Sequence, residues 1–359
     1  MLKKYQLLIV KRYLKSFFTI FIGLTVFFTG VDFITNIDKL PDSANLKVMF
    51  AVNRLMYFTS FTFGLSLVFG LISSLVSLIK ENELVVMYSF GASKKLILKS
   101  FLYMIMILIS IFLILNNISA FVSAKQISDN IKKYGQVSKY ESNLFLKSAD
   151  SYIFISELNK YKKEGKNIEV FETKGTDLKR IIKAKKGVFK DNYWLLSDVK
   201  IIQIPRVDDT VVDKKLIVKN IKNLKILDGF KPAIMDSLYK GSTGLTIGDS
   251  IEALGLLKDK GLSVTTIKAN LYQILFFPFF SLFLASILFF KLPVQRRGEN
   301  LGLLAAKLYF IALIIWGILY MLIQISKNGA VLPEIGIILP IIFLGIYSYV
   351  YFKKESIAF

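Results

Sequence analysis

The residues that could do chemistry in this chain are charged side chains in or beside its long apolar segments. Asp32 and Arg54 lie within apolar runs, whereas Lys39 and Lys47 stand between two such runs. A carboxylate near the end of a membrane span is costly unless it faces a wet cavity or pairs with a base. We therefore expect Asp32 to have a basic partner, such as a lysine of a neighbouring subunit. Ion pairing and anion binding are the chemistry that these residue types support.

Other kinds of chemistry are excluded because whole residue types are missing. The 359 residues include no cysteine and no histidine, so there is no thiolate, disulfide, imidazole base or Ser-His-Asp triad. No G-x-x-x-x-G-K-[ST] phosphate loop is present; the nearest piece, Gly165-Lys166-Asn167, lacks the first glycine and the hydroxyl. We expect no catalytic residue, metal or cofactor, and no nucleotide hydrolysis by this chain alone.

A short segment, residues 81–93, joins the second and third apolar runs and has a helical pattern. Leu84, Met87 and Tyr88 recur at i, i+3 and i+4, which gives one apolar face, and Gly91 is expected to end the helix. One interpretation is an interfacial helix that anchors the loop at the membrane. The other is a coupling helix that docks into a groove on a cytoplasmic motor domain. The spacing alone does not separate the two.

Six apolar runs of spanning length must position these residues. The chain is 54% hydrophobic, above the range of an ordinary soluble domain, and the excess is concentrated in stretches of about 20 residues or more. The runs cover about residues 17–34, 49–79, 96–122, 269–290, 301–325 and 335–352. The first run is too long for a signal peptide and has no small-residue cleavage site after it, so we interpret it as a retained helix.

Basic residues predict the orientation of these spans. Five lie among the first fifteen residues, four in the loop 80–99, three in the loop 291–300 and two at the C-terminus, whereas the opposite short loops hold only Lys39, Lys47 and Lys327. The positive-inside rule then puts both termini in the cytoplasm and the long middle region outside. The net charge of +21 reflects these loops and a lysine-rich composition, or in part an anionic partner such as a phosphorylated lipid. Nucleic acid is a poor candidate, because the basic residues are not interleaved with stacking aromatics.

The middle region, residues 123–268, has the pattern of a β domain. Short β-branched and aromatic stretches at 151–155, 167–171, 193–196, 200–204 and 216–218 are separated by turn residues, which is typical of an antiparallel sandwich or jellyroll. A helix over 246–254 follows, capped by Asp249 or Ser250 and ended by Gly261. We expect the core to form around side chains such as Phe154, Phe171, Phe189, Trp194 and Ile202.

The sequence resembles the LptF/LptG lipopolysaccharide export permeases. The likeness begins at Glu83-Leu84-Val85-Val86-Met87, followed by Ser89 and Gly91 in a Ser-x-Gly pattern, and it favours the G-type subunit. Further matching pieces are the stretch 254–261, Pro278, Leu292-Pro293 with Arg296, and 328–333. Their order and spacing, across three helices, an external β domain and three more helices, cover essentially the whole chain.

The resemblance implies a membrane α-helical fold with an inserted periplasmic β-jellyroll. Residues 1–122 would hold three transmembrane helices and the coupling helix 81–93, residues 123–268 the jellyroll, and residues 269–359 three further helices. It implies a permease of an ABC transporter in a Gram-negative inner membrane, with both termini cytoplasmic. Its partners would be a cytoplasmic LptB-like ATPase dimer, an LptF-like sister permease, LptC-like and LptA-like bridge proteins, and lipopolysaccharide.

Two sets of residues follow from the resemblance. ATPase coupling would fall to Glu83, Leu84, Val85, Met87 and Gly91, and closure of the ATPase would drive lipid from a cavity between the spans into the jellyroll. Lipid phosphates would be held near the outer end of the first span, where only Lys39 matches the family's cluster of lysines. Lys47 and Arg54 are candidates to replace the missing members, with Asp32 beside them. Lys39 has a simpler interpretation too, as a lysine that snorkels to the headgroups.

Besides the missing lysines, the sequence departs from the family at one more position, and two alternative functions remain. The family often has a proline midway along the second span, where this chain has Phe63-Gly64, so any kink there must come from glycine. One alternative is a mechanotransducing ABC permease, which usually has four spans. The other is a membrane-anchored binding receptor, which would need no coupling helix.

Overall fold

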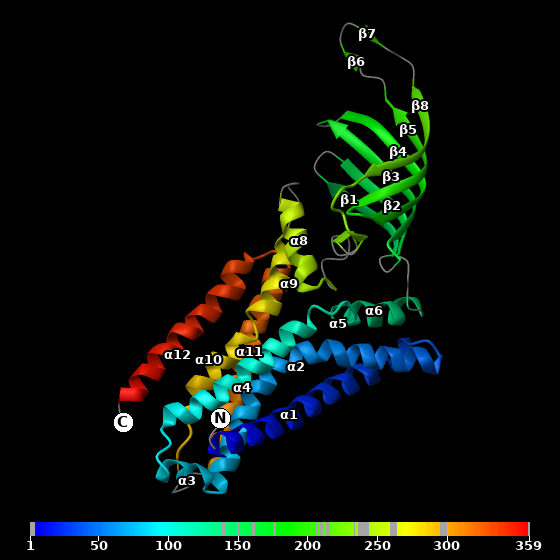
Figure 1. The fold of residues 1–359 in the computed structure, drawn as a ribbon. Helices are drawn as coiled ribbons and strands as arrows, with labels where there is room; N and C mark the ends of the chain where they lie inside the picture. The colour runs from blue at the N-terminus through cyan, green and yellow to red at the C-terminus, as the bar shows by residue number, and fades with distance from the viewer. Residues whose placement is uncertain are drawn as a thin grey trace. The chain divides into compact units, whose positions relative to one another are not determined.

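The structure, a computed structural model, describes most of the chain (Figure 1). The described residues are 4–135, 137, 141–148, 151–159, 162–174, 177–204, 207–208, 211–212, 216–232, 234–235, 244–258, 264–294 and 300–357. The chain divides into two compact units, a helical unit of residues 1–124 and 269–359 and a β unit of residues 125–268.

The helical unit is built from long apolar helices. They are α1 (Lys4–Asn36), η1 (Ile37–Lys39), α2 (Ala44–Lys80), α3 (Glu83–Ser89), α4 (Lys94–Leu115), α5 (Ser119–Val122), α9 (Thr265–Leu275), α10 (Phe279–Phe289), α11 (Leu301–Lys327), η2 (Glu334–Ile338) and α12 (Leu339–Ile357). Among the described residues, five helical segments are long and apolar enough to cross a membrane. The pair α9 and α10 passes the same test together and makes a sixth, bent by 42° at the break before Pro278.

Helix α2 is the centre of this unit. Its most apolar stretch is 78% buried, against 17–39% in the other four unbroken spans, because α1, α10 and α11 pack against it and Phe63 stacks on Phe112 of α4. Two glycines permit this close packing. A Cβ atom on Gly64 would lie 2.7 Å from Cε1 of Phe280 on α10, and one on Gly70 would lie 3.0 Å from the backbone of Phe17 on α1. Gly64, in the place of the family's proline, therefore serves helix contact within an unbroken α2.

The β unit holds one main sheet. The described elements of this unit are, in chain order, α6 (Ala124–Tyr134), β1 (Glu141–Ser148), β2 (Ser151–Asn159), β3 (Glu164–Lys174), β4 (Asp177–Lys190), β5 (Tyr193–Gln203), β6 (Val207–Asp208), β7 (Val211–Val212), β8 (Ile217–Ile226) and α8 (Ile247–Lys258). The sheet has six antiparallel strands in the order β1-β2-β3-β4-β5-β8, and β6 pairs with β7 as a small hairpin. The described strands thus form an antiparallel β domain inserted between the membrane helices, as the sequence predicted.

The core of the β unit lies on one face of this sheet. Trp194 is fully buried there, and its indole Nε1 donates a hydrogen bond to the carbonyl of Phe230 at 2.7 Å. Gly187 makes room for this packing, since a Cβ atom on it would lie 2.5 Å from Cδ1 of Ile168. Phe189 is buried as expected. The neighbouring strands bury other side chains than predicted, such as Ile153 and Ile155 in place of Phe154.

The two remaining expected core residues, Phe171 and Ile202, are also only partly buried. Phe171 pairs in register with Tyr152 and Ile181, and Ile181 in turn with Ile202, so one rung of apolar side chains crosses the sheet. Side chains alternate between the two faces of a strand, and Val170, next to Phe171, is in the core. This apolar rung therefore lies on the face opposite the core.

Helix α8 begins with a different cap than predicted. The side chain of Thr246 accepts a hydrogen bond from the backbone amide of Asp249 at 3.0 Å, and it donates one to the Asp249 carboxylate at 2.7 Å. Thr246 is thus the N-cap residue, and the Asp249 carboxylate binds the hydroxyl of that cap rather than its backbone amide, unlike the acidic residue of a capping box. Asp249 thus belongs to the cap as its second member. Gly261, the expected end of this helix, lies outside the described residues.

Candidate functional site

The short helix α3 is held between two sharp turns of the chain. Asn82, directly before it, has a left-handed backbone with φ of 60°, and Gly91, shortly after it, has φ of 80°. Such angles are tolerated best by glycine and asparagine. Ser93 then caps α4 by accepting a hydrogen bond from the amide of Leu96. The helix predicted from the sequence is therefore present, and Gly91 lies just beyond its last residue.

The apolar face of α3 is covered by the protein's own helical unit. Leu84 and Met87 are only 4% and 5% exposed and belong to the main helical core. Val86 is 50% exposed and Phe90 84% exposed on the other side of the segment. Met87 is therefore buried within the chain itself and offers no free surface to a partner. The free apolar surface belongs to Val86 and Phe90, while Val85 is partly buried.

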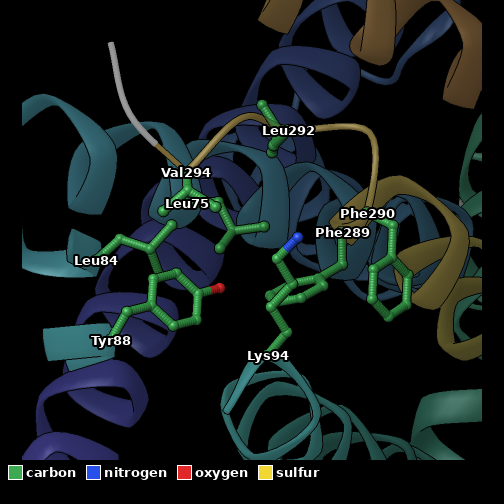
Figure 2. Close-up of a pocket in the computed structure, with 8 residues that line it drawn as sticks. All are labelled: Leu75, Leu84, Tyr88, Lys94, Phe289, Phe290, Leu292 and Val294. Atoms are coloured by element: carbon green, nitrogen blue, oxygen red, sulfur yellow. The ribbon is translucent and has the colours of Figure 1, made fainter. Parts of the chain in front are cut away.

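A small cavity lies beside α3, which lines it with Leu84 and Tyr88 (Figure 2). Its lining comes from α2, α3, α4 and the end of α10 with the following loop: Leu75, Leu84, Tyr88, Lys94, Phe289, Phe290, Leu292 and Val294. Its volume of about 20 Å³ suits a single water molecule and no larger ligand. Burial raises the pKa of Tyr88 to about 12, so its hydroxyl is neutral at physiological pH. We assign no ligand to this cavity.

Two acidic residues at the start of this segment pair with one arginine from α1. The Arg12 guanidinium donates hydrogen bonds from Nη1 and Nη2 to the Glu81 carboxylate, the first of them at 3.0 Å. Nη2 also donates a hydrogen bond to Oε1 of Glu83, at 2.9 Å. The hydrogen bonds from Arg12 lower the pKa of the Glu81 carboxyl. Glu83 thus has a basic partner within the chain.

A second ion pair lies between α1 and α2, in the halves of these helices next to the turn that joins them. Nε of Arg54 lies 3.0 Å from Oδ2 of Asp32, and Arg54 is only 6% exposed. The guanidinium carbon of Arg54 also lies 5.2 Å from the ring centre of Phe50 and 5.8 Å from that of Tyr57. Aromatic faces attract cations at such distances. Asp32 therefore has its basic partner within the same chain, an arginine rather than the expected lysine of a neighbouring subunit.

Lys39 and Lys47 lie at the turn between α1 and α2. Lys39 ends η1 and is exposed. The ammonium of Lys47 lies 3.9 Å from the carboxylate of Asp42, which is fully exposed. Of the four residues that we assigned to lipid binding, the structure thus pairs Asp32 with Arg54 and leaves Lys39 and Lys47 at the solvent-facing end of the hairpin.

Arg12 and Phe90 are the residues that the sequence analysis missed. Arg12 is the only arginine among the five basic residues of the N-terminus, and arginine suits a forked pair with carboxylates better than lysine does. That difference was a usable signal. Phe90 lies next to Gly91 in a segment whose apolar face was already assigned to other residues, so the pattern gave no reason to select it.

Comparison with known protein families gives a match over most of the chain. The sequence model of the family described as lipopolysaccharide export system permease LptF/LptG matches residues 7–354. No curated protein matches the chain. The matched range includes α3, both ion pairs and the complete β unit.

Proposed function

This chain belongs to the LptF/LptG family of lipopolysaccharide export permeases, and from that premise we propose that it is the G-type permease of an ABC transporter. In this proposal a separate cytoplasmic ATPase drives the extraction of lipopolysaccharide from the inner membrane. The lipid then passes to periplasmic bridge proteins. A sister permease of the F type forms the other half of the cavity that receives the acyl chains.

Family membership directly supports the general part of this function. The chain is a transport subunit of a lipopolysaccharide export system, and its apolar helices make it a multi-pass protein of the inner membrane. Such a system includes a sister permease and further export proteins.

The exposed apolar surface of α3 carries the proposal of ATPase coupling. Val86 and Phe90 are exposed on a segment whose other face is fixed to the helical unit by Leu84 and Met87. A large exposed aromatic side chain on a rigid support is a typical anchor of a protein interface. In this arrangement, Glu83, Leu84, Val85, Met87 and Gly91 hold and shape the coupling segment, and Val86 and Phe90 contact the ATPase.

Lipid binding falls to Lys39 and Lys47 in this proposal. Both lie at the α1–α2 turn, and an ammonium group attracts lipid phosphates when it is not fully neutralised by a neighbour. Asp32 and Arg54 neutralise each other and fix the two helices on which the lysines stand. Hence we assign these two residues a supporting role in the lipid site.

The bridge proteins have a natural place to dock on the β unit. Strands β1 and β8 form the two edges of the six-stranded sheet. An edge strand can accept a strand from another β domain through its unpaired backbone groups. β8 is ten residues long and exposes Ile217, Val218 and Ile221, so we propose β8 as the edge that receives the bridge.

The orientation of the chain tests this proposal first. Because the protein has no cysteine, Ser89→Cys on α3 and Ser43→Cys before α2 each introduce a single reactive site. A membrane-impermeant maleimide added to spheroplasts is expected to label Cys at position 43 and to leave position 89 unlabelled until the membrane is opened. The opposite labelling pattern would place α3 outside the cell and rule out contact with a cytoplasmic ATPase.

Charge reversal at Lys39 tests the lipid site. Lys39→Glu replaces attraction for phosphate with repulsion, so crosslinking of lipopolysaccharide to the purified complex is expected to fall, and the difference to shrink at high salt. Lys133→Glu on α6 is a control, because it changes the same charge at an exposed residue outside the α1–α2 hairpin. Equal crosslinking in both variants would remove Lys39 from the site.

A further inference from the structure

Arg12 connects the first membrane helix to both ends of the turn that leads into the coupling segment. Glu81 follows the last residue of α2, and Glu83 is the first residue of α3. The single guanidinium of Arg12 binds both carboxylates. One planar cation therefore holds α1, the end of α2 and the start of α3 at the same point.

This part of α1 is firmly attached to α2. Tyr13, next to Arg12, is fully buried, and its hydroxyl donates a hydrogen bond to the carbonyl of Leu67 at 3.2 Å. One turn further, the backbone of Phe17 meets α2 at Gly70, where a Cβ atom would lie 3.0 Å away. Helices packed this closely move together, because a dense interface does not deform gradually. A displacement at Arg12 is thus passed to α1 as a whole.

The Glu83 carboxylate has a second oxygen that is not used by Arg12. Oε2 of Glu83 is buried and has no hydrogen-bond partner in the described part of the chain. Glu81, by contrast, accepts hydrogen bonds from both Arg12 and Ser77. The two carboxylates therefore differ: Glu81 fixes Arg12 to α2, and Glu83 links the same arginine to the segment that carries Phe90.

We infer that Arg12 is a positioning residue that transmits movement of the coupling segment to the first membrane helix. When α3 shifts against the helical unit, Glu83 draws Arg12 with it, and α1 follows. Because α1 leads to the α1–α2 turn with Lys39 and Lys47, this link connects the ATPase contact to the outer end of the lipid site. The inference rests on the proposed function, since it takes α3 to be the segment that the ATPase moves.

The link itself can be tested on the chain without an ATPase. A nitroxide label at Ser89→Cys, on the otherwise cysteine-free protein, reports the mobility of α3. Arg12→Gln is expected to make the label clearly more mobile, and Arg12→Lys to restore part of the order, because one ammonium can keep a single ion pair but not the fork. Lys15→Gln, an exposed residue on the same helix, is expected to leave the spectrum unchanged. Equal spectra for Arg12→Gln and Lys15→Gln would overturn the inference.

The transmission is tested in proteoliposomes that contain the complete complex. We expect Arg12→Gln to keep the ATPase bound and hydrolysing ATP, while lipopolysaccharide released per ATP falls about tenfold, as for loss of a charge-assisted contact. The double variant Glu81→Gln/Glu83→Gln is expected to give the same loss, with no further loss when Arg12→Gln is added. Unchanged release per ATP in Arg12→Gln would overturn the inference and leave the proposed function intact. Failure of the unmodified chain to bind any ATPase would instead contradict the proposed function, and the transmission with it.

Discussion

Replacement of Phe90 by aspartate is expected to separate the ATPase from the permease. Phe90 is 84% exposed in the chain alone, so it gains most from burial at an interface. Burial of one such side chain is worth roughly 1.5–3 kcal/mol, which corresponds to roughly ten- to hundredfold in affinity. Aspartate removes this gain and adds the cost of a charge in an apolar contact. The measurement is the amount of ATPase that co-purifies with the tagged permease complex.

Two control variants make this result specific. Phe90→Leu keeps an apolar side chain at the same exposed position and is expected to retain most of the ATPase. Met87→Leu keeps the volume of a buried side chain and is expected to behave like the unmodified protein. Met87→Asp is not a useful test, because it would place a charge inside the helical core. Full recovery of the ATPase with folded Phe90→Asp protein would show that the contact surface lies elsewhere.

Replacement of Arg54 by alanine is expected to cause the largest loss of stability in the helical unit. The variant leaves the Asp32 carboxylate without its cation between two packed helices. Removal of one partner of a buried ion pair typically costs about 3–5 kcal/mol. We therefore expect a clear fall in the unfolding temperature in detergent, followed through the tryptophan fluorescence of Trp194 and Trp316.

The matched comparison is Lys47→Ala. Lys47 also faces a carboxylate, but at 3.9 Å and with a fully exposed partner, Asp42, and ion pairs near the surface contribute about 0–1 kcal/mol. Asp32→Asn/Arg54→Gln should recover part of the lost stability, because neither charge then remains. An unchanged unfolding temperature in Arg54→Ala would mean that the pair does not support the helices. Arg54 would then return as a candidate for phosphate binding.

The membrane helices were predictable because their signal is local. Length and apolar character identify a span without knowledge of its neighbours, and the break in the fourth span falls at Pro278, where the chain loses a backbone donor. The helix α1 nevertheless begins at Lys4, well before the apolar run that starts near residue 17. Charged residues do not end a helix when they can reach the membrane surface or a partner such as Glu81.

The β unit could be predicted only in part from local sequence patterns. Strands β2, β3 and β5 were found, but Phe154 and Phe171 were assigned to the wrong face. Both faces of these strands carry apolar residues, so alternation alone could not tell which face is the core. Strand order depends on connections between distant segments, so the order β1-β2-β3-β4-β5-β8 could not be predicted from local patterns.

The ion pairs show a signal that remained unused. Thr25 bonds to Thr62 and Asp32 pairs with Arg54, so the two helices align around a centre near residue 43. A hairpin centred on that turn brings residue 32 opposite residue 54, a relation that the sequence contained but that we did not use. The burial of Leu84 and Met87 by the chain's own helices could not be predicted in this way, because an amphipathic pattern does not say which surface its apolar face meets.

The central claim is that this chain couples ATP hydrolysis to removal of lipopolysaccharide from the membrane. The most direct measurement uses proteoliposomes with the permease, its sister permease, the ATPase and lipopolysaccharide, and follows transfer of the lipid to a soluble bridge protein. We predict transfer that requires both ATP and this chain and that is lost with Phe90→Asp. ATP hydrolysis by the intact complex with no transfer, or equal transfer when this chain is omitted, would contradict the account.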